Sequence, residues 1–229
     1  MPFSFAARLT RSRLFILAAA LAIAGLLIAV VGQTGPAHAA TGRAAQASAA
    51  SWGGGPKPTI VLVHGAWADS GSWNGVIARL QRAGYSVVAP PNPLRGVSYD
   101  SDYLADFLSP TSTAITGPVV LVGHSYGGFV ITNAATGNPN VKALVYVDAF
   151  IPAQGDTLGG LSSAQPGSCL LAGSPFTTAP YPGAQGGDVD LYVKASVFPG
   201  CFANGLPPDQ AAVLAATQRP LPFLSLIHI

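Results

Sequence analysis

Short apolar runs alternate along the chain with segments whose apolar residues recur at helical spacing. The runs are predicted strands, because they are four or five residues long, rich in Val, and bounded by Gly or Pro. The strands span 59–63, 86–89, 118–122 and 143–147, and the helices span 73–83, 98–108 (with Ser98 as N-cap) and 126–136. This alternation predicts an α/β fold with a parallel sheet. Because the strands are apolar throughout, we expect helices on both faces, giving a three-layer αβα sandwich with a mostly parallel sheet.

The pattern is lost after residue 150. Residues 59–149 are therefore assigned to the N-terminal part of the α/β core. Residues 150–223 are dominated by Gly, Pro and Ser, with one predicted helix at Pro208–Thr217. We expect an irregular cap or lid above the sheet in this region.

The N-terminal residues 1–39 have the pattern of a secretory signal peptide. Three arginines within the first thirteen residues precede an apolar run from Leu14 to Val31, and Ala37-His38-Ala39 forms a small-x-small cleavage site. The prediction is a secreted protein. The alternative is an uncleaved anchor, since 18 apolar residues nearly suffice to span a bilayer, and this segment is the only membrane contact we expect. Residues 40–58, mostly Ala, Gly, Ser and Pro, are predicted to be a flexible linker.

Composition narrows the function classes. Of the 229 residues, 49% are hydrophobic and 9% are charged, which argues against a disordered polyelectrolyte and a coiled coil. The formal net charge of +2 argues against a dedicated nucleic-acid binder.

The chain has two cysteines, Cys169 and Cys201. In an exported protein such a pair indicates a disulfide, and two buried free thiols are the alternative. Neither cysteine has the spacing of a metal ligand, so we expect no zinc site.

One motif carries chemistry. Gly123-His124-Ser125-Tyr126-Gly127 matches G-x-S-x-G, directly follows a predicted strand and opens a predicted helix. That context is the nucleophile elbow, in which a sharp strand-to-helix turn projects the serine Oγ at the carboxyl end of the sheet. Ser125 is therefore the candidate catalytic nucleophile. The alternative is a structural serine in a tight turn.

A serine nucleophile also needs N–H donors for the oxyanion of its tetrahedral intermediate. The residue after the nucleophile, Tyr126, supplies the first N–H. The loop after the first strand supplies the second, and Ala66 is the candidate there. The neighbouring His64 is expected to stabilise this loop rather than to act as the catalytic base.

Three segments resemble the α/β-hydrolase superfamily. They are His64-Gly65-Ala66-Trp67, Gly123-His124-Ser125-Tyr126-Gly127-Gly128 and Val145-Tyr146-Val147-Asp148-Ala149-Phe150. The chain is most similar to the branch of small esterases, plant methylesterases and hydroxynitrile lyases, in a secreted bacterial form. The resemblance covers about residues 58–223. It implies a sheet of about eight strands, a cap after the sixth strand, and a triad in the order Ser, Asp, His.

The resemblance also implies a function. We expect a serine hydrolase that cleaves small apolar esters through an acyl-enzyme, without a metal or an organic cofactor. The alternatives are a hydroxynitrile lyase, a lactonase or a perhydrolase on the same scaffold, or a non-catalytic binding protein.

The chain departs from this family at its C-terminal end, where the last strands, the acid and the histidine of the triad are expected. None of its four histidines (His38, His64, His124 and His228) is a credible general base. We therefore expect a C-terminally truncated chain that is inactive by itself. Asp148 is a candidate acid at the end of the fourth strand, but a loop carboxylate bonded to backbone N–H groups is the favoured interpretation. Residues 224–229 resemble a non-native tail.

Overall fold

The computed structural model describes residues 55–111, 115 and 117–226, all within one compact unit, Ala50–Ile229. The predicted signal peptide, residues 40–54 of the predicted linker and residues 227–229 of the predicted tail lie outside the described residues. Within the described ranges, no helix is both long and apolar enough to cross a bilayer. Lys57 donates from Nζ to the Ala83 carbonyl at 2.7 Å, so the chain is already attached to the fold before the predicted linker ends.

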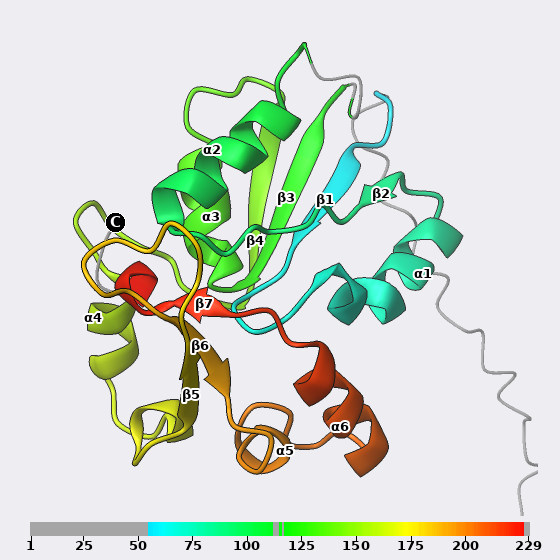
Figure 1. Ribbon diagram of the computed structural model, residues 1–229. Helices are drawn as coiled ribbons and strands as arrows, with labels where there is room; N and C mark the ends of the chain where they lie inside the picture. Colours follow the sequence, from blue (N-terminus) through cyan, green and yellow to red (C-terminus); the bar gives the residue numbers. More distant parts are fainter. Residues whose placement is uncertain (1–54, 112–114, 116, 227–229) are drawn as a thin grey trace, which may run out of the picture. The chain divides into compact units, whose positions relative to one another are not determined.

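The core is a four-stranded parallel sheet in the order β2-β1-β3-β4 (Figure 1). Its strands are β1 (Thr59–Val63), β2 (Val87–Val88), β3 (Val119–Ser125) and β4 (Val141–Ala149). This confirms the predicted parallel α/β core. The strand β4 forms one edge of the sheet, and Val145 and Val147 on it are each 42% exposed.

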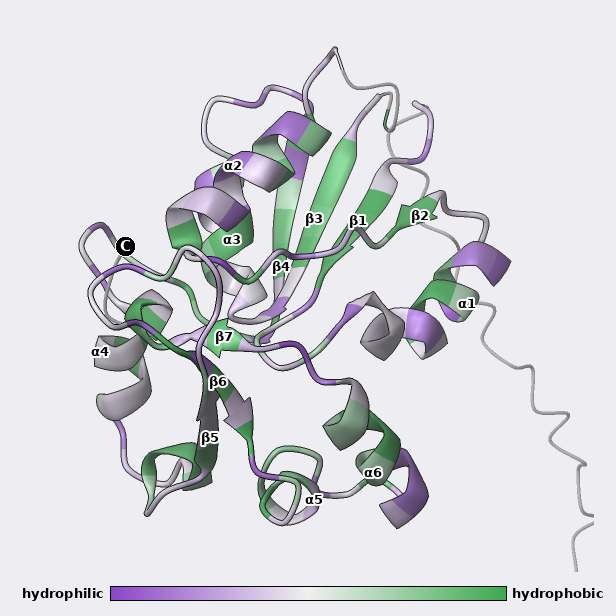
Figure 2. Cartoon of the chain, viewed as in Figure 1, coloured by the Kyte–Doolittle hydropathy of each residue, from purple (hydrophilic) through white to green (hydrophobic). Residues whose placement is uncertain are grey.

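Apolar side chains form a cluster on each face of the sheet. The strands β1, β3 and β4 are accordingly coloured as largely hydrophobic in Figure 2. Ile60 and Leu62 of β1 pack with residues of α1 (Asn74–Arg82), which follows a short 3-10 turn, η1 (Ser70–Trp73). On the opposite face, Val61 and Val63 belong to the cluster that holds α2 (Val97–Phe107) and α3 (Gly127–Ala134). The alternation of β1 residues between two clusters confirms the three-layer αβα sandwich.

The predicted N-cap of the second helix is wrong. The helix α2 begins at Val97, with Gly96 as its cap and no side-chain cap bond. Asp100 of its first turn reaches back instead and accepts from the Arg95 N–H at 2.9 Å. A carboxylate inside the first turn thus stabilises the chain that enters the helix, so no serine cap is needed.

The cap region is more ordered than expected. It contains a second sheet of antiparallel strands in the order β5-β6-β7. Its elements are α4 (Leu158–Ser163), η2 (Cys169–Leu171), β5 (Phe176–Ala179), β6 (Asp190–Val193), α5 (Phe198–Cys201), α6 (Pro208–Thr217), β7 (Leu221–Pro222) and η3 (Phe223–Leu226). The sequence analysis therefore missed this second sheet, while the predicted helix at Pro208–Thr217 is confirmed.

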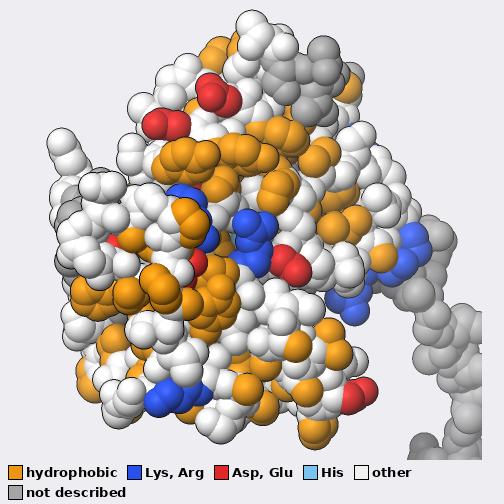
Figure 3. Space-filling model, viewed as in Figure 1, with side chains coloured by type: hydrophobic (Ala, Val, Ile, Leu, Met, Phe, Trp, Pro, Cys, Tyr) orange, Lys and Arg blue, Asp and Glu red, His pale blue; other side chains and the backbone are white. Residues whose placement is uncertain are grey.

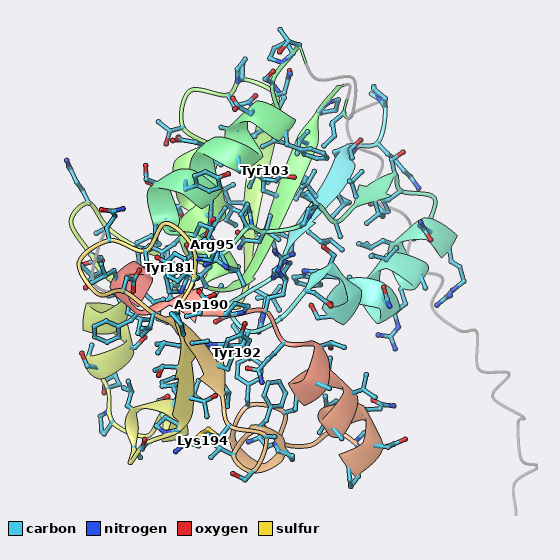
Figure 4. The ribbon with its side chains drawn as sticks, viewed as in Figure 1. Arg95, Tyr103, Tyr181, Asp190, Tyr192 and Lys194 are labelled. Carbon is cyan, nitrogen blue, oxygen red and sulfur yellow. A yellow bond between two sulfur atoms is a disulfide. The ribbon has the colours of Figure 1, made fainter. Side chains whose placement is uncertain are left out.

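Covalent and polar bonds fasten the cap. A disulfide joins Cys169 to Cys201, with a Cα–Cα distance of 5.9 Å. Arg95, just before α2, forms an ion pair of 2.8 Å with Asp190 on β6 and lies over the Tyr181 ring (Figure 4). In the predicted tail, the Leu224 N–H donates to Asp188 Oδ1 at 2.9 Å. Cap and tail are thus held by contacts between distant parts of the sequence.

Candidate active site

Ser125 lies at the junction between β3 and α3. It is the last residue of β3, and α3 begins at Gly127. The backbone of Ser125 has φ 51°, in the left-handed region that residues with a side chain rarely adopt. Strain of this kind persists only where the surrounding structure imposes it, and it clusters at functional sites. The local geometry is that of a strand–turn–helix elbow.

Three glycines allow the backbones around this turn to approach one another. A Cβ on Gly123 would lie 2.6 Å from the Gly127 carbonyl oxygen, and one on Gly127 would lie 2.5 Å from the Val63 carbonyl oxygen. A Cβ on Gly128 would overlap the Phe150 carbonyl oxygen. Because the opposing atoms are backbone atoms, no rotamer change could relieve the overlap. These glycines let α3 begin immediately behind Ser125.

The loop after β1 lies against Ser125. A Cβ on Gly65 would come within 2.8 Å of Ser125 Cβ, which places the loop backbone beside the serine. Within the part of the chain that the structure describes, the N–H groups of Ala66 and Tyr126 donate no hydrogen bond. Two N–H donors are therefore free in the two segments that flank Ser125.

His64 has a structural role. It is fully buried, and its Nδ1 donates to the Gly65 carbonyl at 2.9 Å. Its Nε2 accepts from the Asn92 N–H at 3.0 Å, while the Asn92 amide donates to the His64 carbonyl at 3.1 Å. Burial lowers the pKa of His64, which favours the neutral ring that this bonding requires. Both ring nitrogens are thus engaged in holding the loop. No sequence motif surrounds Asn92, so its hydrogen bonds to His64 could not be predicted from the sequence.

Within the described residues, neither His124 nor Asp148 is hydrogen-bonded to the Ser125 side chain. The ring of His124 lies edge-on to Trp73, with centroids 6.3 Å apart, and burial lowers its pKa. Asp148 is exposed and has φ 44°, at an irregular point in the pairing of β3 with β4. Among the described residues, no hydrogen bond connects Ser125 Oγ with a histidine or an aspartate. The backbone bonds expected at the Asp148 carboxylate are not formed within that part of the chain either.

A buried hydrogen bond connects Tyr126, the residue between Ser125 and α3, to the helix α2. The Tyr126 side chain is fully buried, and its hydroxyl donates to Asp100 Oδ2 at 2.7 Å. Burial raises the pKa of Asp100, because the ionised carboxylate loses hydration, and the same cause raises the pKa of Tyr126. The side chain of Tyr126 therefore anchors the turn, while its N–H has no partner in the described ranges. The sequence did not indicate Asp100, since an aspartate in a first helical turn is usually a surface residue.

Asp100 predicts a pH dependence of stability. Since its pKa is raised on folding, its contribution is fully present below about pH 4, the pKa of an unfolded aspartate, and is lost as pH rises through the folded pKa. Asp100→Asn removes this titration. Urea unfolding from pH 3 to pH 8 should therefore show the variant gaining stability relative to wild type as pH rises, by about 1.4 kcal/mol per unit of raised pKa. Asp102→Asn, at an exposed position of the same helix, is the control. A difference between Asp100→Asn and wild type that is constant with pH would contradict this account.

The described residues contain no group of three or more His, Cys, Asp or Glu side chains that could hold a metal ion. Figure 3 shows, on one face of the molecule, hydrophobic side chains interspersed with charged groups of both signs. This face therefore has no continuous basic surface of the kind that binds a phosphate backbone.

Comparisons with known proteins identify relatives that are named as esterases. A carbendazim hydrolyzing esterase of Nocardioides sp. is 38% identical over 111 residues, which cover 44% of this chain and 46% of the esterase. The putative chloroplastic methylesterase 15 of Arabidopsis thaliana is 26% identical over 180 residues, which cover 74% of this chain and 40% of that protein. The chain thus spans less than half the length of these two relatives.

Solved structures show the same fold. Tomato methylketone synthase I, complexed with 2-tridecanone, superposes with a TM-score of 0.55 at 22% sequence identity, covering 74% of this chain and 69% of the synthase. The sequence model of the alpha/beta hydrolase family matches residues 60–228, which is most of the chain. With its parallel sheet, its elbow and this match, the chain belongs to the alpha/beta hydrolase family.

Proposed function

We propose that this protein is a carboxylic ester hydrolase that works through an acyl-enzyme on Ser125. The observation that carries the proposal is the left-handed backbone of Ser125 in a strand–turn–helix. Beside it lie the N–H groups of Ala66 and Tyr126, which donate no hydrogen bond to any described residue. The relatives named as esterases support the same reaction class.

The reaction follows from this geometry. Ser125 Oγ attacks the ester carbonyl, and the N–H groups of Ala66 and Tyr126 stabilise the oxyanion that forms. Collapse of the intermediate expels the alcohol and leaves an acyl-serine, which water then hydrolyses to the acid and free Ser125. Removal of one oxyanion donor typically costs about 3 kcal/mol of transition-state stabilisation, so these two backbone positions matter greatly.

The general base belongs to a part of the protein outside residues 55–226. Both nitrogens of His64 are occupied, and His124 packs against Trp73. A histidine, with a carboxylate to orient it, must therefore be contributed from elsewhere to accept the Ser125 proton. A protein restricted to the described residues would be inactive. The reaction needs no metal or organic cofactor.

The substrates we propose are small, largely apolar esters. The cap contributes aromatic side chains from β5 and α5, and few charged groups lie in this part of the chain. We also propose that the protein is exported. The disulfide between Cys169 and Cys201 supports that location, since disulfides persist in oxidising compartments.

The second candidate is a different reaction on the same scaffold. A methylketone synthase shares this fold, so the fold alone does not fix hydrolysis. A lyase acting on cyanohydrins, a lactonase and a perhydrolase are the specific alternatives, and a binding protein is the non-enzymatic one.

The experiment compares turnover of p-nitrophenyl esters, cyanohydrins and lactones by the native gene product. We expect p-nitrophenyl acetate or butyrate to be the preferred substrate, with a burst of p-nitrophenol equal to the enzyme present. Ser125→Ala should remove both burst and turnover. Preferred cleavage of a cyanohydrin, or ester turnover that survives in Ser125→Ala, would refute the proposal.

A further inference from the structure

The indole of Trp67 connects the loop that carries Ala66 to the cap. The Trp67 Nε1–H donates to the Leu191 carbonyl at 2.9 Å, across 124 residues of sequence. Leu191 is in β6, between Asp190 and Tyr192, which are labelled in Figure 4. The hydrogen bond is buried, so its loss would leave an unpaired carbonyl or indole N–H in the interior.

Two aromatic side chains of the cap also contact the Trp67 indole. Its ring stacks on Phe176 of β5 with centroids 5.1 Å apart, and it meets Phe202, directly after α5, edge-on at 6.0 Å. Phe202 packs in turn on Phe198 at 4.7 Å and adjoins Cys201 of the disulfide. The strands β5 and β6 and the residue that follows α5 therefore all contact the Trp67 side chain.

The backbone of Trp67 shows that its position is imposed. It has φ 55°, a left-handed conformation that is unfavourable for a bulky residue. On the other side of Ala66, Gly65 lies against Ser125 Cβ. The Ala66 N–H is thus held between a residue fixed by the nucleophile and a residue fixed by the cap.

We infer that Trp67 is a positioning residue, through which the cap sets the Ala66 N–H for the oxyanion. This inference rests on the proposed function. Trp67 is buried and acts through Ala66 rather than on substrate. Weakening its cap contacts should therefore affect the transition state more than ground-state binding, because the oxyanion exists only after attack.

The test uses Trp67→Phe in the native gene product, which keeps an aromatic ring but removes the bond to Leu191. We expect kcat on p-nitrophenyl butyrate to fall about 10- to 100-fold while KM stays within about threefold. An aryl trifluoromethyl ketone, which forms an oxyanion on addition of Ser125, should bind more weakly by a similar factor. Trp73→Phe is the matched control, since Trp73 is equally buried but its Nε1 has no partner among the described residues.

The outcomes separate this inference from the proposed function. A folded Trp67→Phe enzyme with wild-type kcat and ketone affinity would overturn the inference alone, as would equal losses in Trp67→Phe and Trp73→Phe. If Trp67→Phe does not fold, Phe202→Leu decides by the same criteria, because it weakens the contact from the cap side. If the wild type itself shows no Ser125-dependent turnover, the proposed function fails first, and the inference falls with it.

Discussion

Gly128→Ala is expected to destabilise the fold severely, by about 3 kcal/mol or more. The new Cβ would overlap the carbonyl oxygen of Phe150, and it would also lie 3.1 Å from Ala149 Cβ. Phe150 follows the last residue of β4, so relief of the overlap requires α3 to move away from the sheet. That movement would open the buried cluster around Phe129 and Val130, which is the largest apolar cluster described.

Urea unfolding followed by far-UV circular dichroism measures this loss. Gly75→Ala is the matched control, since Gly75 lies within α1 and a Cβ there would meet nothing within 4 Å. The control should be more stable than wild type by about 0.5–1 kcal/mol, the usual gain from Gly to Ala inside a helix. If the Gly128→Ala variant unfolds at the same urea concentration as wild type, then α3 does not lie as close to β4 as described.

Ser125→Gly should abolish turnover and yet stabilise the protein. Loss of Oγ removes the proposed nucleophile, and loss of the nucleophile in serine hydrolases lowers kcat by at least about 10³-fold. The left-handed backbone at φ 51° costs a residue with a side chain about 1–2 kcal/mol, which glycine avoids. This gain exceeds the 0.5–1 kcal/mol that glycine ordinarily loses through its freedom in the unfolded chain.

Ser125→Ala is the comparison that isolates the strain, because both variants lack Oγ. We expect both to be inactive and the glycine variant to be more stable in thermal unfolding by about 0.5–1 kcal/mol. Elsewhere in strands and helices the order of alanine and glycine is the reverse. If alanine proves the more stable residue at position 125, the elbow stores no strain and its resemblance to a nucleophile turn is superficial.

The sequence predicted the core well because its signals are local. The strands predicted at 59–63 and 143–147 are continuous apolar runs. The first has the same bounds as β1, and the second lies within β4. The elbow is marked by a motif whose glycines have a steric purpose that does not depend on the rest of the fold. For these parts, pattern and structure agree because the same local physics determines both.

The remainder depends on contacts that no local pattern encodes. The cap sheet is built from strands of two to four residues, too short for an alternating pattern to be recognised. The bonds of Asn92 to His64 and of Trp67 to Leu191 bridge 28 and 124 residues of sequence. Asp100 is buried, and its partners are the Tyr126 hydroxyl and the Arg95 backbone N–H. These pairings follow from tertiary packing, which overrides the surface location that each polar residue suggests.

The central claim is that the Ser125 hydroxyl is the nucleophile, and active-site labelling tests it most directly. The native gene product is treated with a fluorophosphonate, digested and mapped by mass spectrometry. The account predicts one phosphonyl adduct, on the peptide that contains Ser125, with parallel loss of ester turnover and no adduct in Ser125→Ala. An enzyme that hydrolyses esters while Ser125 stays unmodified, or whose inactivation follows an adduct at another residue, would contradict it.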